Sequence, residues 1–193
     1  MSKPFASLLL VPLLLLGLAG QPAPAEARHA HADAAEVVLH RYVDYINQKN
    51  WPAFAGLWSA GLHPMWGSFF GSADNRKNHV GVLGIKRAQL VGYHEVPKAF
   101  GVNFVGNGTG RYLETPGVES RFFYTAIRYD VFNESKYMLN GINYVFLVLV
   151  KEKGHWRVCQ SSVAPAAHFI EGGYGFGTAD ERSYDERRMR FAR

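Results

Sequence analysis

The chain has 193 residues and a formal net charge of +5, with 48% hydrophobic and only 19% charged residues. This length favours one domain with short appendages, and it is enough to bury a core without disulfides or metals. The apolar content excludes a wholly disordered chain, and near-ordinary glycine and proline usage excludes a collagen-like one. A single cysteine, Cys159, excludes a disulfide framework and a multi-cysteine metal site.

Residues 1–27 are predicted to be a cleaved signal peptide. Residues 5–20 form an uncharged apolar stretch rich in leucine, and residues 25–27 have the sequence Ala-Glu-Ala, which matches a cleavage signal. The alternative is an uncleaved anchor, but the stretch is short for a membrane helix and contains Pro12. We therefore expect a secreted or periplasmic protein that starts near Arg28 and has no transmembrane anchor after processing.

The first part of the mature chain is predicted to be helical. After a flexible lead at residues 28–33, residues 34–49 carry apolar side chains at i, i+3 and i+4, the pattern of an amphipathic helix. Residues 52–59 form a second, short helix, because Pro52 suits a first helical turn. Residues 61–78, rich in glycine and aromatic residues, are predicted to be a loop.

The second part of the chain is predicted to be a sheet. β-Branched and aromatic residues dominate four segments, one of which alternates between two faces and one of which is apolar almost throughout, as a strand covered on both faces would be. These predicted strands are residues 80–96, 121–132, 140–151 and 155–162. Residues 97–117, rich in glycine and asparagine, are predicted to be a long loop or an irregular hairpin.

Residues 166–193 are predicted to be a glycine-rich turn followed by a polar helical tail from about Ala179. Acidic and basic residues are mixed along this tail at helical spacing, which favours a solvated helix face, with a polyanion-binding tail as the alternative. We expect the tail to be peripheral, so that truncation at Thr178 would leave a cooperatively folding domain.

Several short segments resemble the nuclear transport factor 2-like superfamily, which includes polyketide-cyclase-like domains with a cystatin-like fold. The residues that carry the resemblance are 43–51 (VDYINQKNW), 57–58 (LW) and 153–158 (KGHWRV). Residues 77–83 and 175–178 also look like uncharacterised secreted bacterial members. The resemblance implies an α+β fold.

In that fold, N-terminal helices pack on a strongly curved, mostly antiparallel sheet that forms a cone. Residues 34–165 would make up this domain, followed by the C-terminal peripheral helix. A pocket at the open end of such a cone is mostly apolar with a few polar groups. Aromatic residues from the helices and strands are the candidates to line it, although they could equally fill the core. These candidates are Tyr42, Tyr45, Trp58, Trp66, Tyr129 and Tyr144.

Catalytic residues are harder to find in the sequence. Isomerases and dehydratases of the superfamily use a carboxylate or histidine base in the pocket, with a tyrosine or acid as donor. The inward face of the strand at 121–132 carries no carboxylate, because Asp130 falls on the other face. His79 with Tyr45 as donor is the remaining candidate pair, although a structural or surface histidine is the commoner outcome. The departure from an acid-plus-base pattern argues against an enzyme.

No metal, cofactor or nucleic acid is expected. His29 and His31 could hold a transition metal with the amino terminus, but their spacing is not a high-affinity pattern. Cys159 lies inside an alternating strand, where a lone cysteine is usually an inert, small apolar residue. The positive charges are spread along the chain rather than clustered.

Three functions remain open from the sequence. The first is a secreted, non-catalytic ligand-binding or protein-interaction domain, with a small apolar or aromatic ligand and a homodimer as expected partners. The second is a small-molecule isomerase, dehydratase or cyclase that acts in the cone pocket. The third is an envelope-associated protein that binds anionic polymers through its basic surface.

Overall fold

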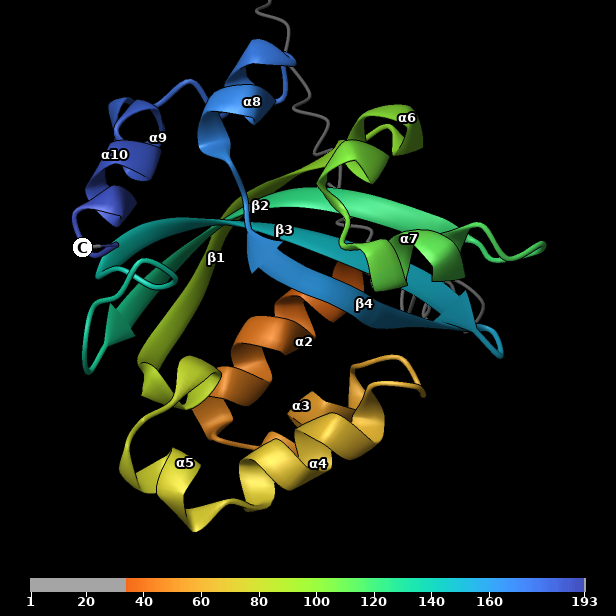
Figure 1. Ribbon diagram of the computed structural model, residues 1–193, viewed down its shortest axis with the longest axis horizontal. Coiled ribbons are helices and arrows are strands. Elements are labelled where there is room, and N and C mark those ends of the chain that lie inside the picture. Colours follow the sequence, from red (N-terminus) through yellow and green to blue (C-terminus); the bar gives the residue numbers. More distant parts are fainter. Residues whose placement is uncertain (1–33, 193) are drawn as a thin grey trace, which may run out of the picture.

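Helices precede the sheet along the chain. The computed structural model (Figure 1) describes residues 34–192, so the predicted signal peptide, the flexible lead and the two lead histidines lie outside the described residues. The helices before the first strand are α2 (Ala35–Gln48), α3 (Trp51–Gly56), α4 (His63–Gly71) and α5 (Ala73–Lys77). No helix within residues 34–192 has both the length and the apolar character needed to cross a membrane.

Helix α2 forms where the apolar spacing predicts it. Its buried side chains, which include Val38, Leu39 and Ile46, share one face, and Lys49 ends the helix in the left-handed conformation with a φ of 54°. Asn50 then caps α3, since its side chain accepts a hydrogen bond from the Ala53 N–H at 3.2 Å. The two predicted N-terminal helices are confirmed, although α3 is shorter than expected.

The prediction of a loop at residues 61–78 is wrong, because α4 and α5 occupy most of that segment. Aromatic packing stabilises α4 despite its glycines: Phe70 stacks on Trp51 with ring centroids 5.1 Å apart, and Trp66 lies 5.5 Å from Phe70. Ser72 caps α5 by accepting a hydrogen bond from the Asn75 N–H. Tertiary contacts thus outweigh the low helix propensity of glycine.

The sheet has four antiparallel strands in the order β1-β2-β3-β4. The strands are β1 (Ile85–Val96), β2 (Ser120–Val131), β3 (Gly141–Glu152) and β4 (His155–Val163). The prediction of an α+β protein with a mostly antiparallel sheet is therefore confirmed. The first predicted strand begins later than expected, because Gly81–Gly84 form a short 3-10 helix, η1.

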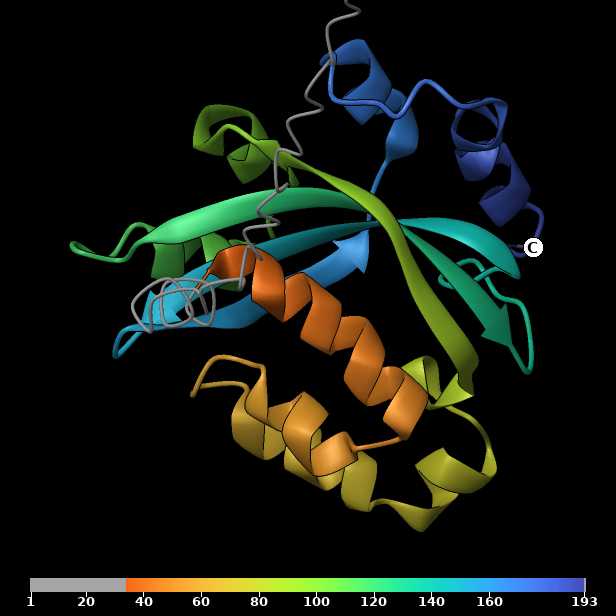
Figure 2. The ribbon, with the colours of Figure 1, turned by 180° about the vertical axis from the view of Figure 1, so that it is seen from behind.

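Both faces of the sheet are covered, and each has its own apolar core. On one face, α2, α3 and α4 pack against β-strand residues that include Phe123, Ile127 and Leu147. On the other face, Phe122 and Tyr124 belong to a second core. Figures 1 and 2 show the N-terminal helices on one side of the sheet and α6 to α10 on the other. The alternation along β2 and the double coverage of β3 agree with the sequence pattern.

Residues 97–117 also differ from the prediction of a loop or hairpin. They form α6 (Lys98–Gly101), the 3-10 helix η2 (Val102–Phe104) and α7 (Asn107–Leu113). Phe100 and Phe104 anchor this segment, with ring centroids 5.3 Å and 4.9 Å from Phe169 on the second core. The segment is helical because its few apolar side chains reach the sheet, a contact that its glycine-rich composition does not reveal.

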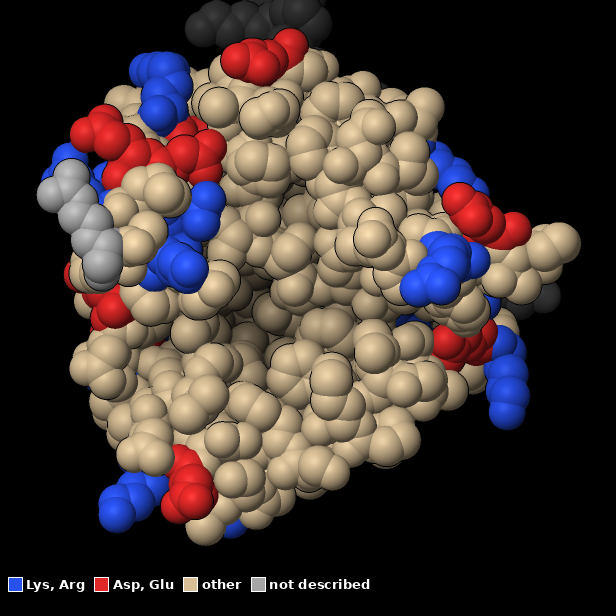
Figure 3. All heavy atoms as spheres, in the orientation of Figure 1, with Lys and Arg blue, Asp and Glu red and all other residues tan. Residues whose placement is uncertain are grey.

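The C-terminal tail is not peripheral. It forms α8 (Ala166–Glu171), α9 (Ala179–Arg182) and α10 (Tyr184–Met189), and Tyr184 is 0% and Glu181 1% exposed. Mixed acidic and basic side chains do gather at the outer corner formed by α9 and α10 (Figure 3). The inner side of the same helices nevertheless carries Tyr184, which belongs to the second core, and the buried carboxylate of Glu181, so the charge pattern describes only the outer side.

Candidate functional site

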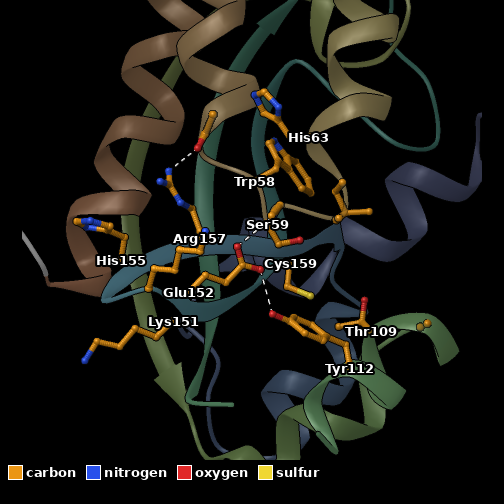
Figure 4. A pocket seen from close by; sticks show the side chains of 17 residues that line it. Trp58, Ser59, His63, Thr109, Tyr112, Lys151, Glu152, His155, Arg157 and Cys159 are labelled. Atoms are coloured by element: carbon orange, nitrogen blue, oxygen red, sulfur yellow. Dashed lines mark hydrogen bonds between the residues drawn. The ribbon is translucent and has the colours of Figure 1, made fainter. Parts of the chain in front are cut away.

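A large cavity lies beside β4, at the edge of the sheet. It has a volume of about 1260 Å³, somewhat above the ~300–1,000 Å³ usual for small-molecule sites. Its walls come from three places: residues 56–63, residues 106–112 around α7, and the β3–β4 hairpin (Figure 4). The side chains labelled in Figure 4 are those of Trp58, Ser59, His63, Thr109, Tyr112, Lys151, Glu152, His155, Arg157 and Cys159. We call this space the β4-edge cavity.

The first wall is held by main-chain hydrogen bonds to the edge strand. The Val158 N–H donates to the Leu57 carbonyl oxygen at 2.8 Å, and the Ser59 N–H donates to the Val158 carbonyl oxygen at 2.9 Å. Trp58 thus forms a parallel bridge with Val158. This short pairing covers part of an otherwise open sheet edge and fixes the side of the cavity to which Trp58 and Ser59 belong.

Glu152 connects all three walls. Its Oε1 accepts a hydrogen bond from the Tyr112 hydroxyl on α7, and its Oε2 accepts one from the Ala60 N–H, both at 3.0 Å. Burial, and then the hydrogen bond to the Glu152 carboxylate, raise the pKa of Tyr112 above its ordinary value. Tyr112 therefore stays protonated and keeps donating its hydrogen bond at neutral pH.

Cys159 occupies an irregular position in β4. Val148 pairs with Gln160 and Leu149 pairs with Val158, so Cys159 is the extra residue of a β-bulge. Its side chain is buried, and burial raises the pKa of the thiol, while a hydrogen bond with Thr109 acts in the opposite direction. The thiolate needed for nucleophilic chemistry is therefore scarce at neutral pH.

The described lining of the cavity carries more positive than negative charge. Lys151, Lys153 and Arg157 are cationic, and Glu152 is the one carboxylate among the lining residues. Lys151 lies 3.5 Å from Glu119, outside the lining, so its charge is partly compensated. Arg157 donates from Nη1 to the carbonyl oxygen of Gly56 and thus runs along one wall.

The two predicted tryptophans lie together, but only one lines this cavity. The rings of Trp58 and Trp66 have centroids 4.5 Å apart, and Trp58 is a lining residue whereas Trp66 packs behind it against the core of α2 to α4. Tyr45 likewise packs, half-buried, against that core. Of these three predicted pocket residues, Trp58 lines the cavity, and Trp66 and Tyr45 pack against the core.

Tyr42 on α2 and Tyr129 on β2 are both buried in the core between the N-terminal helices and the sheet. The Tyr42 hydroxyl lies 3.1 Å from Ser161 Oγ and is hydrogen-bonded to Tyr129, and burial raises the pKa of both tyrosines. Tyr144 lies on the opposite face, where its hydroxyl is 3.1 Å from Thr178 Oγ1. The expectation that Tyr144 shares one pocket with Tyr42 and Tyr129 is wrong, because Tyr144 pairs with Ala126, whose side chain belongs to the second core.

The predicted base, His79, and the predicted donor, Tyr45, do not form a hydrogen-bonded pair in the described part of the chain. His79 is exposed, has a φ of 52°, and stacks on Phe132 with ring centroids 3.8 Å apart. No hydrogen bond connects it to Tyr45 within residues 34–192. Asp130 lies on the outer surface, where it pairs with Lys86 at 3.6 Å. Within residues 34–192, no group of three or more histidine, cysteine, aspartate or glutamate side chains is placed to hold a metal.

The sequence does not predict most of the residues that line the cavity. Thr109 and Tyr112 lie in a segment expected to be a loop or an irregular hairpin, and Glu152 lies between the predicted strands at 140–151 and 155–162. The local signal is the short connection between those two strands, which predicts that the charged residues on either side of it lie close together. Nothing local indicates that Tyr112 and Ala60 would meet the same carboxylate.

Comparison of the chain with protein-family models, with curated proteins and with solved structures gave no match.

Proposed function

We propose that this chain is a non-catalytic binding protein whose ligand is a small organic molecule held in the β4-edge cavity. The observation that carries the proposal is Glu152, whose two oxygens tie α7 and residue 60 to the β3–β4 hairpin around a space of about 1260 Å³. Ligand sites are typically concave and preformed, with a few polar groups placed on a largely apolar wall. Trp58 and Leu62 supply apolar wall, and Thr109 and Ser59 supply polar groups.

The residues in the cavity favour binding over covalent chemistry. A nucleophile needs an adjacent base or a lowered pKa, whereas burial raises the pKa of the Cys159 thiol. The Glu152 carboxylate could act as a base, but both of its oxygens already accept hydrogen bonds from the protein. These groups orient a ligand without offering it an activated attacking atom.

The fold and the location of the protein are part of the same proposal. We place the chain in the nuclear transport factor 2-like superfamily, with the sheet as a curved cone around α2, and we propose that it is secreted after cleavage near Arg28. The antiparallel order and the register shifts in β1–β2 and β3–β4, which bend strands, support the cone. N-terminal sequencing of the exported protein tests the cleavage site, since a retained Met1 would contradict it.

Filling the cavity tests the binding function. Gly108 lines the cavity, and a Cβ built on it meets no atom within 4 Å, so a larger side chain fits without a clash at its base. Gly67 on α4 is an equally free, exposed helical glycine that does not line the cavity. The neutral fluorescent dye N-phenylnaphthylamine serves as the probe. We expect Gly108→Trp to lower its affinity at least about tenfold, and the matched control Gly67→Trp to leave it unchanged.

Circular dichroism and thermal melting establish that both variants are folded before the comparison is made. Native mass spectrometry of protein purified from expressing cells adds a second readout, because a co-purified small molecule should be present in the Gly67→Trp protein and absent from the Gly108→Trp protein. Dye binding that is equal in wild type and Gly108→Trp, or absent from both, contradicts a ligand site at this place.

A further inference from the structure

The charged side chains that line the β4-edge cavity differ in how far the protein already satisfies them with hydrogen bonds or ion pairs. Both oxygens of Glu152 accept hydrogen bonds from the protein, so part of the acceptor capacity of this carboxylate is already used. Lys153 lies exposed at the hairpin turn, and no hydrogen bond or ion pair of its side chain is found within residues 34–192. An entering ligand therefore meets an excess of positive charge in the lining and one carboxylate whose oxygens already accept hydrogen bonds.

Among the cations that line the cavity, Arg157 is the one whose side chain donates a hydrogen bond to the main chain of a cavity wall. Its Nη1 donates to the Gly56 carbonyl oxygen, and the other guanidinium donors have no protein partner in the described part of the chain. A guanidinium is a planar fork of five N–H donors that matches carboxylate, sulfonate and phosphate oxygens. One fixed donor holds the fork in place, which lowers the entropy lost when the remaining donors bind an anion.

The apolar wall lies next to this fork. Gly56 is the partner of Arg157, and Trp58 and Leu62 follow shortly after it in the same wall. A molecule that places an oxyanion on Arg157 would therefore have its apolar part within reach of the Trp58 and Leu62 side of the cavity. A fully hydrophilic anion would leave that side uncovered, and an uncharged apolar molecule would leave the guanidinium without a partner.

We infer that the ligand of the β4-edge cavity is an amphiphilic organic anion, with its oxyanion on Arg157 and its apolar body along Trp58 and Leu62. The inference rests on the proposed binding function and specifies the chemical class of the ligand. The protein recognises the anion by a fork that its own main chain orients, and Lys153 adds positive charge at the exposed turn.

Two dyes that share one ring system provide the test. Anilinonaphthalene sulfonate carries an anionic group that N-phenylnaphthylamine lacks, and both fluoresce on entering an apolar site. We expect wild type to bind the sulfonate dye more tightly than the neutral dye. We also expect added sodium chloride to weaken binding of the sulfonate dye only, because salt screens charge interactions.

Three variants distinguish binding of the anion by the Arg157 guanidinium from a general effect of positive charge. Arg157→Gln should weaken sulfonate binding about tenfold or more, since hydrogen bonds between charged groups contribute more than neutral ones, and should leave the neutral dye within about twofold. Arg128→Gln removes the same charge from an exposed position on β2 outside the cavity and should change neither affinity. Lys153→Gln, at a position free of packing, should weaken sulfonate binding by about twofold.

The outcomes distinguish the two proposals. Neutral-dye binding that is sensitive to Gly108→Trp, together with equal affinity for the two dyes or no effect of Arg157→Gln, overturns the anionic class and leaves the binding function in place. Loss of both dyes on Gly108→Trp, with selective loss of the sulfonate dye on Arg157→Gln, supports both. If Arg157→Gln fails to fold, Lys153→Gln and the salt dependence decide, and sulfonate affinity insensitive to both contradicts the inference.

Discussion

The Tyr124 hydroxyl on β2 donates a hydrogen bond at 2.8 Å to the Glu181 carboxylate on α9, and both side chains are buried. The second carboxylate oxygen accepts the Gly177 N–H at 2.9 Å. A buried carboxylate is stable only where such donors satisfy it. This pair therefore fastens the C-terminal helices to the sheet and makes them part of the domain.

Tyr124→Phe should destabilise the protein. The substitution keeps the ring and removes the donor, which leaves a buried carboxylate oxygen without its partner, and we expect the free energy of unfolding to fall by about 1–3 kcal/mol. Urea unfolding followed by circular dichroism measures the change. Tyr137→Phe is the matched control, because Tyr137 is 62% exposed and should lose no stability. Equal unfolding midpoints for the two variants would contradict the fastening role of Glu181.

Truncation at Thr178 should damage the fold, in contrast to the expectation from the charge pattern. It removes Tyr184, which packs against Tyr144 with ring centroids 5.1 Å apart, and it exposes the second core. Losing one fully buried aromatic side chain alone costs about 3–5 kcal/mol. Thermal melting should show a midpoint well below that of the full chain. An unchanged midpoint would show that the tail is peripheral and does not stabilise the domain.

The ion-pair cluster around Arg121 should make stability depend on pH. Hydrogen bonding to Arg121 lowers the pKa of Glu36 below its ordinary value, with burial acting in the opposite direction. Because the folded-state pKa lies below the unfolded one, the stabilisation is present above the unfolded pKa and is lost as the pH falls through the folded value.

Glu36→Gln should therefore be less stable than wild type at neutral pH, and the difference should vanish under acid conditions. Unfolding midpoints in urea from about pH 7 to about pH 3 cover this range. Glu171→Gln removes a carboxylate from an exposed position and should show no such pH-dependent difference. A wild-type advantage that stays constant down to the lowest pH would show that the Glu36 carboxylate does not produce it.

The spacing of apolar residues along the sequence predicts α2 and the strands, but it does not predict the helices in the segments between them. The apolar stripe of α2 and the alternation of Phe122 and Phe123 follow from helical and strand periodicity, because burial on one side imposes a period on the sequence. The helices in residues 61–78 and 97–117 depend instead on aromatic contacts such as Trp51 with Phe70. Those contacts join residues whose proximity only the folded chain establishes.

The candidate site shows the same division more sharply. Trp58 is predicted to line a pocket because it is aromatic and lies near the end of a helix, and it does line the β4-edge cavity. Glu152, however, acts through Ala60, which is 92 positions away, and Tyr112, which is 40 positions away. No spacing rule connects these residues, so a site made by converging segments could not be read from any one of them.

Cys159 should react slowly with alkylating reagents. Burial raises the pKa of the thiol, so at neutral pH the thiolate, which is the reactive form, is scarcer than in an exposed cysteine. Alkylation by iodoacetamide, followed by mass spectrometry, should be slow in the folded protein and complete in denaturant. Cys159→Ser should keep the binding of N-phenylnaphthylamine, and its loss in a folded Cys159→Ser protein would mean that the thiol takes part in binding.

Tyr112→Phe should loosen one wall of the cavity without unfolding the domain. The Tyr112 hydroxyl is the hydrogen-bond donor that links α7 to Glu152, and Glu152 is only partly buried, so water can replace the lost donor. We expect a loss of about 1 kcal/mol in the free energy of unfolding, near the average for one hydrogen bond. Hydrogen–deuterium exchange should rise in Asn107–Leu113 and stay unchanged in α2, which packs on the opposite face of the sheet in the other core.

Glu152→Gln separates the charge from the hydrogen bonds at the same point. The amide oxygen can accept from the Ala60 N–H while the amide NH2 donates to the Tyr112 hydroxyl oxygen, so both links can be kept, with the hydrogen bond to Tyr112 reversed in direction. Exchange in α7 and at residue 60 should therefore stay close to the wild-type level in Glu152→Gln and rise in Glu152→Ala, where both links are lost. If Glu152→Ala leaves exchange in both walls at the wild-type level, packing alone holds the cavity open and Glu152 does not organise it.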